Sequence, residues 1–483
     1  MFGLEYRTLL LKDIIEILDI SEEALSVEEI RKRLGYSNSV TILKSLKELI
    51  EFINQIDGQD KFSVELMNPK RGYFKLKRFS TNLQSLFELV FSQDIAYDIL
   101  LELIEKRVVY KVNFCLTHNI SAATLYRKIQ QINQEVAAYN IQISYGNEIK
   151  FKAEELNIRI FSYVFIWSTS RQFPNIFGSN TKPNMNFFAE EVLKYLNIPY
   201  SSLQIELLSI WIFIYSNAIS RKKELSLTEE QFDIIQAFTL PKKPEFFSQW
   251  SNLDWNMLLV TMYNSDLYDI YLPLSINIES NTLKKMMKSQ KLFLMILESY
   301  FSVLNNYDKE KLSENWAKYY LAYYFTNYDS EPSKNTTHIL NMETFQSAYP
   351  NYWKRFENFW LEFIQQVDDP HHYDAMKVPC LLMIIRFYPI EKFGFPPSEI
   401  SLFLSTDTSL SFSEFLKQAI YLRFRDQYMI QFVSEVSDAE IIVATNPFDK
   451  NQIRVDQEFL VVSSQMREVD FNSLKELFEK LQM

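Results

Sequence analysis

The sequence of 483 residues contains few glycines, cysteines and histidines. It has only 7 Gly and lacks both GxGxxG and GxxxxGKS/T, which argues against a glycine-rich loop that cradles phosphates. Its 2 cysteines, Cys115 and Cys380, cannot build a disulfide framework, so we expect a reducing cytoplasm. Cys380 lies in the apolar run VPCLLMII and is predicted to be a core residue.

Motifs of catalysis and metal binding are also missing. No nucleophile elbow, HExxH or zinc-ribbon spacing occurs, and no pair of carboxylates stands out as catalytic. One cluster of potential ligands lacks a recognised spacing and is interpreted as an acidic surface loop: Asp368, Asp369, His371, His372 and Asp374. We therefore expect that the protein is not an enzyme and holds no metal and no cofactor.

Long apolar runs are scarce. Acids interrupt the first apolar stretch, which is unlike a signal peptide. The most apolar stretch, Leu207 to Ile219, is too short to span a bilayer and predicts a buried helix. We expect a cytoplasmic protein with no membrane partner.

Charge is distributed unevenly along the chain. The net charge is −11, yet residues 1–152 hold 20 Lys+Arg and 20 Asp+Glu, so residues 153–483 carry all of it with 30 and 41. Within the neutral part, Lys61 to Arg78 contains six basic residues and one acid. A local basic strip beside an acidic remainder fits a protein that touches phosphates at one end, although a solvated charged hairpin would look the same.

A helix, a turn and a longer helix are predicted over residues 113–140. Ser121 can cap the second helix, whose apolar face is Leu125, Ile129, Ile132 and Val136. Its other face is polar and cationic, with Thr124, Tyr126, Arg127, Lys128 and Gln131. The layout is that of a helix-turn-helix DNA reader, and an ordinary helical hairpin is the alternative.

The same pattern occurs earlier in the chain. Ser26 and Glu29 form a capping box, Gly35 stops that helix, and Asn38 or Ser39 begins the next. When Thr41 is aligned with Thr124, Lys44 meets Arg127 and the apolar positions coincide: Ile42 with Leu125, Leu46 with Ile129 and Leu49 with Ile132. Two copies favour DNA readers over incidental hairpins.

A β-type pair follows each copy. The first runs over 61–66 and 73–79 with a turn at 68–72, and the second over 141–144 and 148–151. A helix-turn-helix with such a hairpin is a winged helix. The first wing contains the basic strip, so we expect it to lie along phosphates.

The DNA-contacting residues that we predict lie on the two second helices and on the first wing: Asn38, Ser39, Thr41, Lys44, Lys47, Lys70, Arg71, Lys75, Lys77, Ser121, Thr124, Tyr126, Arg127, Lys128 and Gln131. Most of these side chains are short or weakly directional. Only Arg127 can make the bidentate contact typical of guanine reading. We therefore expect modest sequence specificity, with much of the selection coming from DNA shape.

The remainder of the chain is predicted to be helical and then α/β. Residues 153–389 form long aromatic-rich helices, which suggests helical bundles. Beyond them the pattern gives a strand, a helix, two strands and a helix, at 400–405, 412–435, 440–444, 458–463 and 473–481. The fold class is mainly α with a small C-terminal α/β domain.

The paired helices NSVTILKSLKELI and SAATLYRKIQQIN, with IYSNAISRKKEL (214–225), resemble the Mga/AtxA-type regulators of Gram-positive bacteria. The resemblance implies winged helices at 1–80 and 81–152, phosphotransferase-system regulation domains at 153–275 and 276–392, and an EIIB-like domain at 393–483. It further implies a global transcription regulator of virulence and metabolism that binds double-stranded DNA, responds to carbohydrate status and forms a homodimer through the EIIB-like domain. Phosphotransferase-system proteins are candidate partners.

The chain departs from that family pattern at the phosphate acceptors. Ile214 stands where regulation domains commonly carry a histidine, and an alkyl side chain cannot accept phosphate. Three other histidines in polar contexts are the candidate acceptors: His338, His371 and His372. The 406–409 loop has no cysteine and has Asp407, which would repel phosphate, so the tail is predicted to serve packing or dimerisation.

Two other functions stay open. An RNA-binding antiterminator would share the regulation domains but would begin with a β-rich domain, whereas this chain begins with helices. A phosphotransfer component or scaffold would use the N-terminal modules for protein contacts. The missing acceptors count against phosphotransfer.

Overall fold

The computed structural model describes residues 1–57, 64–70, 72–78, 83–170, 172–174, 177, 181–265, 267–275, 280–326, 342–390, 400–406, 409–424, 428–446 and 453–481. These residues are mainly helical with small sheets, which confirms the predicted fold class at that level. The chain divides into two compact units. One contains residues 1–287 and 317–338, and the other contains residues 288–316 and 339–483, so that the boundary falls within α14 (Asn306–Thr326).

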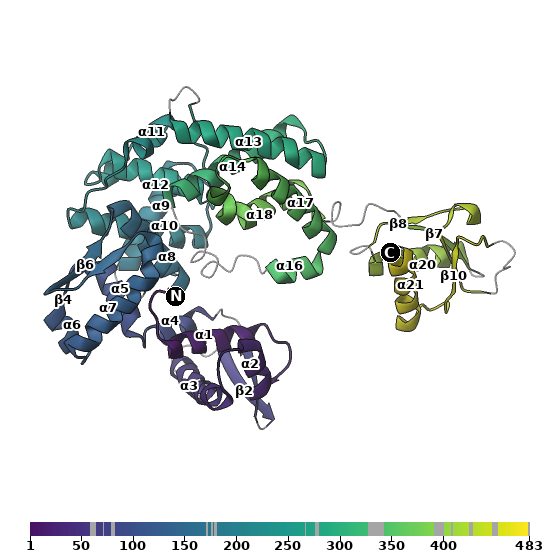
Figure 1. The fold of residues 1–483 in the computed structure, drawn as a ribbon, viewed down its shortest axis with the longest axis horizontal. Coiled ribbons are helices and arrows are strands. Elements are labelled where there is room, and N and C mark those ends of the chain that lie inside the picture. Colours follow the sequence, from purple (N-terminus) through teal and green to yellow (C-terminus); the bar gives the residue numbers. More distant parts are fainter. Residues whose placement is uncertain are drawn as a thin grey trace. The chain divides into compact units, whose positions relative to one another are not determined.

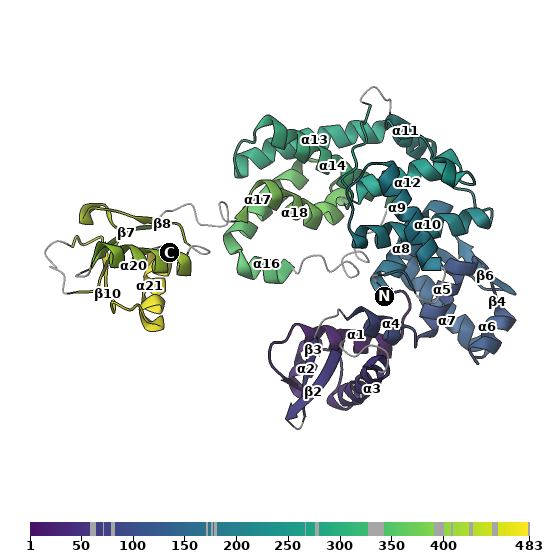
Figure 2. The ribbon, with the colours of Figure 1, turned by 180° about the vertical axis from the view of Figure 1, so that it is seen from behind.

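The first unit begins with a three-helix module (Figure 1). Its elements are α1 (Tyr6–Asp19), β1 (Leu25–Ser26), α2 (Val27–Leu34), α3 (Ser39–Asp57), β2 (Val64–Lys70) and β3 (Tyr73–Arg78). The three strands form an antiparallel sheet in the order β1-β3-β2 (Figure 2). The Ser26–Glu29 capping box is present, and Gly35 ends α2 in the left-handed region with φ 74°. The first module therefore contains the helix, turn, helix and β-hairpin that the sequence predicted, in that order.

A second module repeats this topology. It consists of α5 (Ile95–Lys106), β4 (Val109–Tyr110), α6 (Lys111–Thr117), α7 (Ala122–Val136), β5 (Gln142–Ser144) and β6 (Glu148–Lys152). Its sheet has the order β4-β6-β5. The short strand β4 pairs with the last wing strand β6, just as β1 pairs with β3 in the first module. Sequence reasoning missed β1 and β4, because two residues are too few to show a strand's alternation.

The helix α4 (Gln84–Phe91) joins the two modules through their cores. Leu86 and Val90 belong to the core of the first module, which also contains Leu10, Ile30 and Leu46. Phe91 instead belongs to the core of the second. The modules are thus connected by packed apolar side chains, and not by a linker alone.

The first unit continues as a helical bundle: α8 (Glu155–Ser170), α9 (Thr181–Tyr195), α10 (Ser202–Ser220), α11 (Glu229–Ala237) and α12 (Asn252–Asn264). Within the described residues, α10 alone is long and apolar enough to cross a membrane by length and composition, and 56% of its apolar window is buried in the protein. Core helices pass the same test. Ile214 lies in this buried stretch with 1% of its surface exposed.

The second unit has its own aromatic core. Besides α13 (Asn281–Tyr300) and the first part of α14, it contains α16 (Met342–Ala348), α17 (Pro350–Gln366) and α18 (Lys377–Phe387). The Trp316 ring lies 4.3 Å from Phe293 and 5.4 Å from Phe363, centroid to centroid. Cys380 is fully buried in α18, as predicted, and burial raises the pKa of its thiol.

The C-terminal part is a four-stranded parallel sheet with two helices. Its elements are β7 (Ile400–Ser405), α20 (Leu410–Phe424), β8 (Ile430–Phe432), β9 (Ile441–Ala444), β10 (Glu458–Val461) and α21 (Glu468–Leu481), with strand order β10-β9-β7-β8. The predicted helix over 412–435 is confirmed as far as Phe424 and was wrong at residues 430–432. The chain pairs Ile430–Phe432 with β7 as an edge strand, where Ile430 and Phe432 pack on the core. Tertiary pairing outweighs local helical spacing there.

Candidate nucleic-acid interface

The start of α3 is built from polar side chains that were predicted to face bases. Asn38 Oδ1 accepts a hydrogen bond from the Thr41 N–H at 2.9 Å, which caps the helix. The Ser39 hydroxyl donates to Glu28 in α2, and this bond is the main cause of the lowered pKa of Glu28. Asn38 and Ser39 therefore hold the helix-turn-helix together, a role that the prediction of base contact did not include.

The outward face of α3 carries apolar side chains followed by lysines. Val40 is 80% exposed and Leu43 is 38% exposed. Lys44 and Lys47 follow on the same side, both exposed and without an ion-pair partner among the described residues. The opposite face is fully buried, with Ile42, Leu46 and Leu49 at 0% exposure, as the helical spacing predicted.

The start of α7 repeats the capping arrangement. The Ser121 hydroxyl oxygen accepts a hydrogen bond from the Thr124 N–H at 3.0 Å. The inner face of α7 is completely buried, as predicted: Leu125, Ile129, Ile132 and Val136. Tyr126, Arg127 and Gln131 are exposed, and Arg127 has no hydrogen-bond or ion-pair partner in the described part of the chain.

Lys128 requires a correction. It was predicted to contact DNA, but only 7% of its surface is exposed. Its ammonium lies 3.1 Å from a Glu5 carboxylate oxygen and 4.0 Å from Asp94, and it donates to Gln131 at 3.3 Å. Position 128 adjoins the buried stripe of α7, and an internal carboxylate compensates the ammonium there. Lys128 is therefore part of the internal structure.

The wing turn of the second module is fixed against the start of α7. The Tyr145 hydroxyl donates to the Ala122 carbonyl at 2.9 Å, and its ring lies edge-on to Tyr126 with centroids 5.0 Å apart. The Lys111 ammonium lies 5.6 Å from the centre of the Tyr145 ring. The Lys111 N–H also donates to the Asn147 carbonyl at 3.0 Å. The wing and the helix therefore form one preorganised surface.

The wing of the first module differs from its prediction in length. Strand β2 extends to Lys70, with a register shift between Met67 and Lys70, so that most of the predicted 68–72 turn is strand. Lys75 donates to the Glu22 carbonyl and Arg78 pairs with Asp19 at 2.6 Å, so both contact their own module. Lys61, Arg71 and the Lys70 side chain lie outside the described residues, and Lys77 is exposed on β3. Phosphate contact by this wing stays a prediction.

A buried aspartate connects the two modules. Asp94, whose side chain is fully buried, accepts hydrogen bonds from the Glu5 N–H at 2.6 Å and the Thr8 hydroxyl at 2.9 Å. Its other oxygen caps α5 by accepting from the Ala96 N–H at 2.9 Å. Since Glu5 and Thr8 begin α1, one carboxylate joins the first helix of each module and neighbours Lys128 of α7.

His118 fixes the turn between α6 and α7. Its two ring nitrogens lie 3.2 Å from Asp98 and 3.3 Å from Glu102, both in α5, and its ring stacks on Phe114 at 4.1 Å. Burial raises the pKa of Asp98 to about 6, while the charge of His118 acts in the opposite direction. This geometry gives His118 a structural role.

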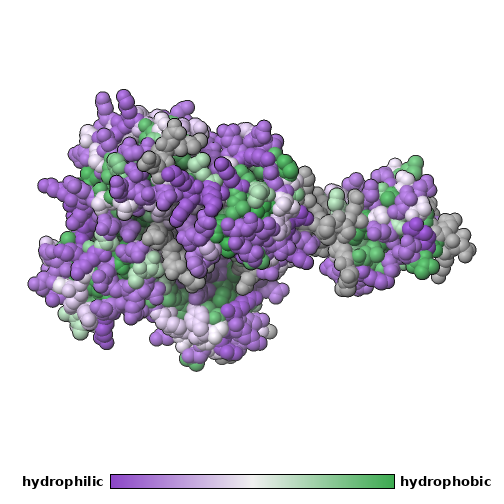
Figure 3. Space-filling view, turned by 45° about the horizontal axis from the view of Figure 1, so that its top comes forward, coloured by the Kyte–Doolittle hydropathy of each residue, from purple (hydrophilic) through white to green (hydrophobic). Residues whose placement is uncertain are grey.

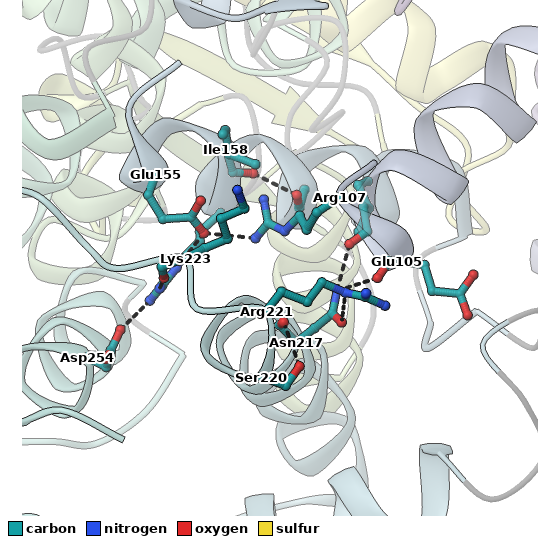
Figure 4. Close-up of polar contacts among 12 residues, drawn as sticks. Glu105, Arg107, Glu155, Ile158, Asn217, Ser220, Arg221, Lys223 and Asp254 are labelled. Carbon is teal, nitrogen blue, oxygen red and sulfur yellow. Dashed lines mark hydrogen bonds and ion pairs between the residues drawn. The ribbon is translucent and has the colours of Figure 1, made fainter. Parts of the chain in front are cut away.

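A buried charge network connects the second module to the helical bundle (Figure 4). Arg107 at the end of α5 and Arg159 of α8 both donate to one oxygen of Glu155, at 2.9 and 3.0 Å. Arg159 also donates to Asp254 of α12 at 2.6 Å and to the Lys223 carbonyl at 3.1 Å. Arg107 is 5% exposed, and its Nε and Nη1 have no hydrogen-bond partner among the residues that the structure describes.

The end of α10 contacts the same part of α5. The Asn217 amide donates to the Ile104 and Glu105 carbonyls at 2.8 and 2.9 Å, and Arg221 in turn donates to Asn217 at 3.1 Å (Figure 4). These residues belong to the IYSNAISRKKEL motif. The motif therefore supplies the amide donor that the carbonyl groups in the last turn of α5 require, next to the helix-turn-helix.

Of the three candidate phosphoacceptors, the structure describes His371 and His372. His371 is exposed and lies 3.4 Å from Asp374 in a short 3-10 helix, and His372 is half-buried beside it. His338 lies outside the described residues. In the described part of the chain, no group of three or more His, Cys, Asp or Glu side chains is arranged to hold a metal ion.

Comparison with known families locates the similarity in the second module. Residues 79–165 match the model of the Mga helix-turn-helix domain. This segment includes α4 to α7, the second wing and most of α8. A comparison with curated proteins gives no match. The match supports a relationship to the Mga-type regulators and identifies residues 79–165 as similar to a DNA-binding helix-turn-helix domain.

Proposed function

We propose that this protein is a cytoplasmic, non-enzymatic transcription regulator of the Mga type that binds double-stranded DNA through α3 and α7. The observation that carries the proposal is the repetition of one winged-helix topology, with a capped second helix whose outward face has unpaired cations in both copies. The match of residues 79–165 adds independent support. The exposed cations on this face are Lys44, Lys47 and Arg127, which can contact phosphates or guanine.

The middle and C-terminal parts are proposed to regulate this binding. Their helices fit degenerate phosphotransferase-system regulation domains that sense carbohydrate status, and the parallel sheet fits an EIIB-like domain. A homodimer through the C-terminal domain is supported by apolar side chains that α20 leaves exposed: Leu410, Phe415, Tyr421 and Leu422. Such side chains are usual in protein interfaces.

The buried Arg107–Glu155–Arg159 network supplies a physical route for regulation. Any change of the helical bundle that moves α8 must either move α5 with it or break charged hydrogen bonds that water cannot replace. Since α5 packs on α7, such a movement would reach the DNA-binding helix.

The experiment is a salt series of duplex-DNA binding with the full chain. Lys44→Ala and Lys47→Ala should each weaken binding to any sequence and reduce the slope of log K against log salt by about 1 if the lysine contacts a phosphate. Lys291→Ala, an exposed lysine of α13, is the matched control and should change neither.

The same assay separates the alternatives. A preference for hairpin RNA over duplex DNA would favour the antiterminator. Absence of salt-sensitive affinity for any nucleic acid would favour the scaffold and refute the proposed function.

A further inference from the structure

The outward faces of α3 and α7 carry the same kind of side chains at equivalent positions. The alignment that pairs Thr41 with Thr124 also pairs Val40 with Ala123, Leu43 with Tyr126, Lys44 with Arg127 and Lys47 with Gln130. Every one of these side chains except the two threonines is exposed, whereas the capping residues Asn38 and Ser121 are engaged within the protein. Each helix therefore presents an apolar pair followed by a cation.

The apolar pair of α3, Val40 and Leu43, is exposed and could be covered by a ligand. Val40 lies in the first turn, where it is 80% exposed, and β-branched residues are not favoured in helices. Leu43, one turn later on the same side, is 38% exposed although the core of the module is close by. In the space-filling view, apolar patches are scattered over a largely hydrophilic surface (Figure 3).

We propose that Val40 and Leu43 of α3, and Ala123 and Tyr126 of α7, read the 5-methyl groups of thymines in the major groove; this inference rests on the proposed function. Thymine alone among the four DNA bases offers a methyl group there, and apolar side chains are its natural contacts. Alkyl side chains cannot make the hydrogen bonds that distinguish the other base edges.

Charge favours DNA over a protein as the occupant of this face. Lys44 lies one helical turn beyond Val40 and Lys47 one turn beyond Leu43, and neither lysine has an ion-pair partner in the part of the chain that the structure describes. Cations beside an apolar pair suit a helix that enters a groove between two phosphate rows. Two apolar side chains on one helix also present too little area for a stable protein interface, which requires roughly 800 Å² on each partner.

The two modules divide the recognition. The first module offers two branched alkyl groups and lysines, so it selects A·T pairs by their methyl groups. In the second module Ala123 is small, Tyr126 is held edge-on to Tyr145 and Arg127 is free to bind guanine. Sensitivity to thymine methyl groups should therefore be greater in the half of the site that α3 contacts.

The test uses the full chain and one duplex that it binds, prepared with thymine or with deoxyuridine, which lacks only the methyl group. We expect affinity to fall about fourfold for each contacted methyl group, the factor that follows from burying one such group. A Val40→Ala/Leu43→Ala variant should bind the two duplexes with nearly equal affinity. Replacing a nearby cytosine by 5-methylcytosine should not change the affinity of this variant.

Controls separate this inference from the proposed function. Val112→Ala/Leu116→Ala removes an equally exposed apolar pair from α6 and should keep the preference for thymine. Lys44→Ala should weaken binding to both duplexes by the same factor. Equal binding of thymine and deoxyuridine duplexes by the natural chain, or an unchanged preference in the Val40/Leu43 variant, overturns the inference and leaves DNA binding intact. A chain with no salt-sensitive affinity for any duplex refutes the proposed function itself.

Discussion

Replacement of Asp94 by alanine tests whether the two modules form one framework. The Asp94 carboxylate is fully buried and accepts three hydrogen bonds, at 2.6, 2.9 and 2.9 Å, from Glu5, Thr8 and Ala96. Two of these donors belong to the start of α1 and the third to α5. The change therefore removes the cap of α5 and the polar link between modules at once.

The expected loss follows from these contacts. Hydrogen bonds to a charged group contribute about 1.5–3 kcal/mol each, and a lost N-cap costs about 1 kcal/mol. These terms are not additive, because one carboxylate makes all the bonds. The buried Lys128 ammonium, 4.0 Å away, also loses compensation and keeps only Glu5. We expect a loss of about 3–5 kcal/mol in the free energy of unfolding, the range for breaking a buried charged contact.

The measurement is urea unfolding of the full chain, followed by circular dichroism and by tryptophan fluorescence. Asp94→Asn should lose less than Asp94→Ala, because its amide oxygen can still accept one or two of the bonds. Ser121→Ala is the matched control, since it removes an exposed N-cap without touching the link and should cost about 1 kcal/mol. A loss below about 1 kcal/mol in Asp94→Ala would show that apolar packing holds the modules together without this polar link.

Three further predictions concern packing, the buried network and pH. Gly3→Ala should destabilise the protein far more than Gly35→Ala in urea unfolding. Both glycines have φ of +74°, but a Cβ at Gly3 would lie 2.7 Å from the α7 backbone, whereas a Cβ at Gly35 would meet open space. The difference between the two losses therefore measures the cost of the clash. Arg107→Met should change the free energy of unfolding by less than about 1 kcal/mol, because two of the buried Arg107 nitrogens have no partner among the described residues. Arg159→Met should cost about 3 kcal/mol or more, because it leaves hydrogen bonds to Glu155 and Asp254 unmade. Similar losses in the two variants would contradict this contrast. Burial raises the pKa of Asp98 to about 6, so the folded state binds the proton more tightly than the unfolded state, and the free energy of unfolding falls as pH rises from about 4 to 6. In pH-dependent unfolding, the natural chain should lose up to about 3 kcal/mol over that interval relative to Asp98→Asn. If its free energy of unfolding instead rises relative to that of Asp98→Asn, the prediction is refuted.

Local signals allowed the helices of the two N-terminal modules to be predicted from sequence. The capping box of Ser26 and Glu29, the stop at Gly35 and the cap at Ser121 all act within one helical turn, so the sequence contains both partners of each interaction. Helical spacing likewise identified every fully buried position of α7. These signals were enough to find the repeat and the helices α3 and α7.

Non-local contacts account for what the sequence missed. Lys128 looks like a surface cation until Glu5, 123 positions earlier, is placed beside it. Strand β8 exists only because β7 is available to pair with it. The ion pairs of Arg107 with Glu155 and of Arg159 with Asp254 join residues that are 48 and 95 positions apart, so no local spacing in the chain indicates them.

The same competition between local and distant partners determines which side chains α3 and α7 present outward. A short polar side chain at a helix start can cap the helix or face a base, and sequence does not choose between them. The structure assigns Asn38 and Ser121 to capping, which leaves alkyl groups and a few cations outward. Each helix alone then has little means of discrimination, since Arg127 is the one bidentate donor on these faces among the described residues. Specific binding must come from using both modules together, because linked sites gain affinity through effective concentration. We therefore propose that the Asp94 link contributes to DNA selection as well as to stability.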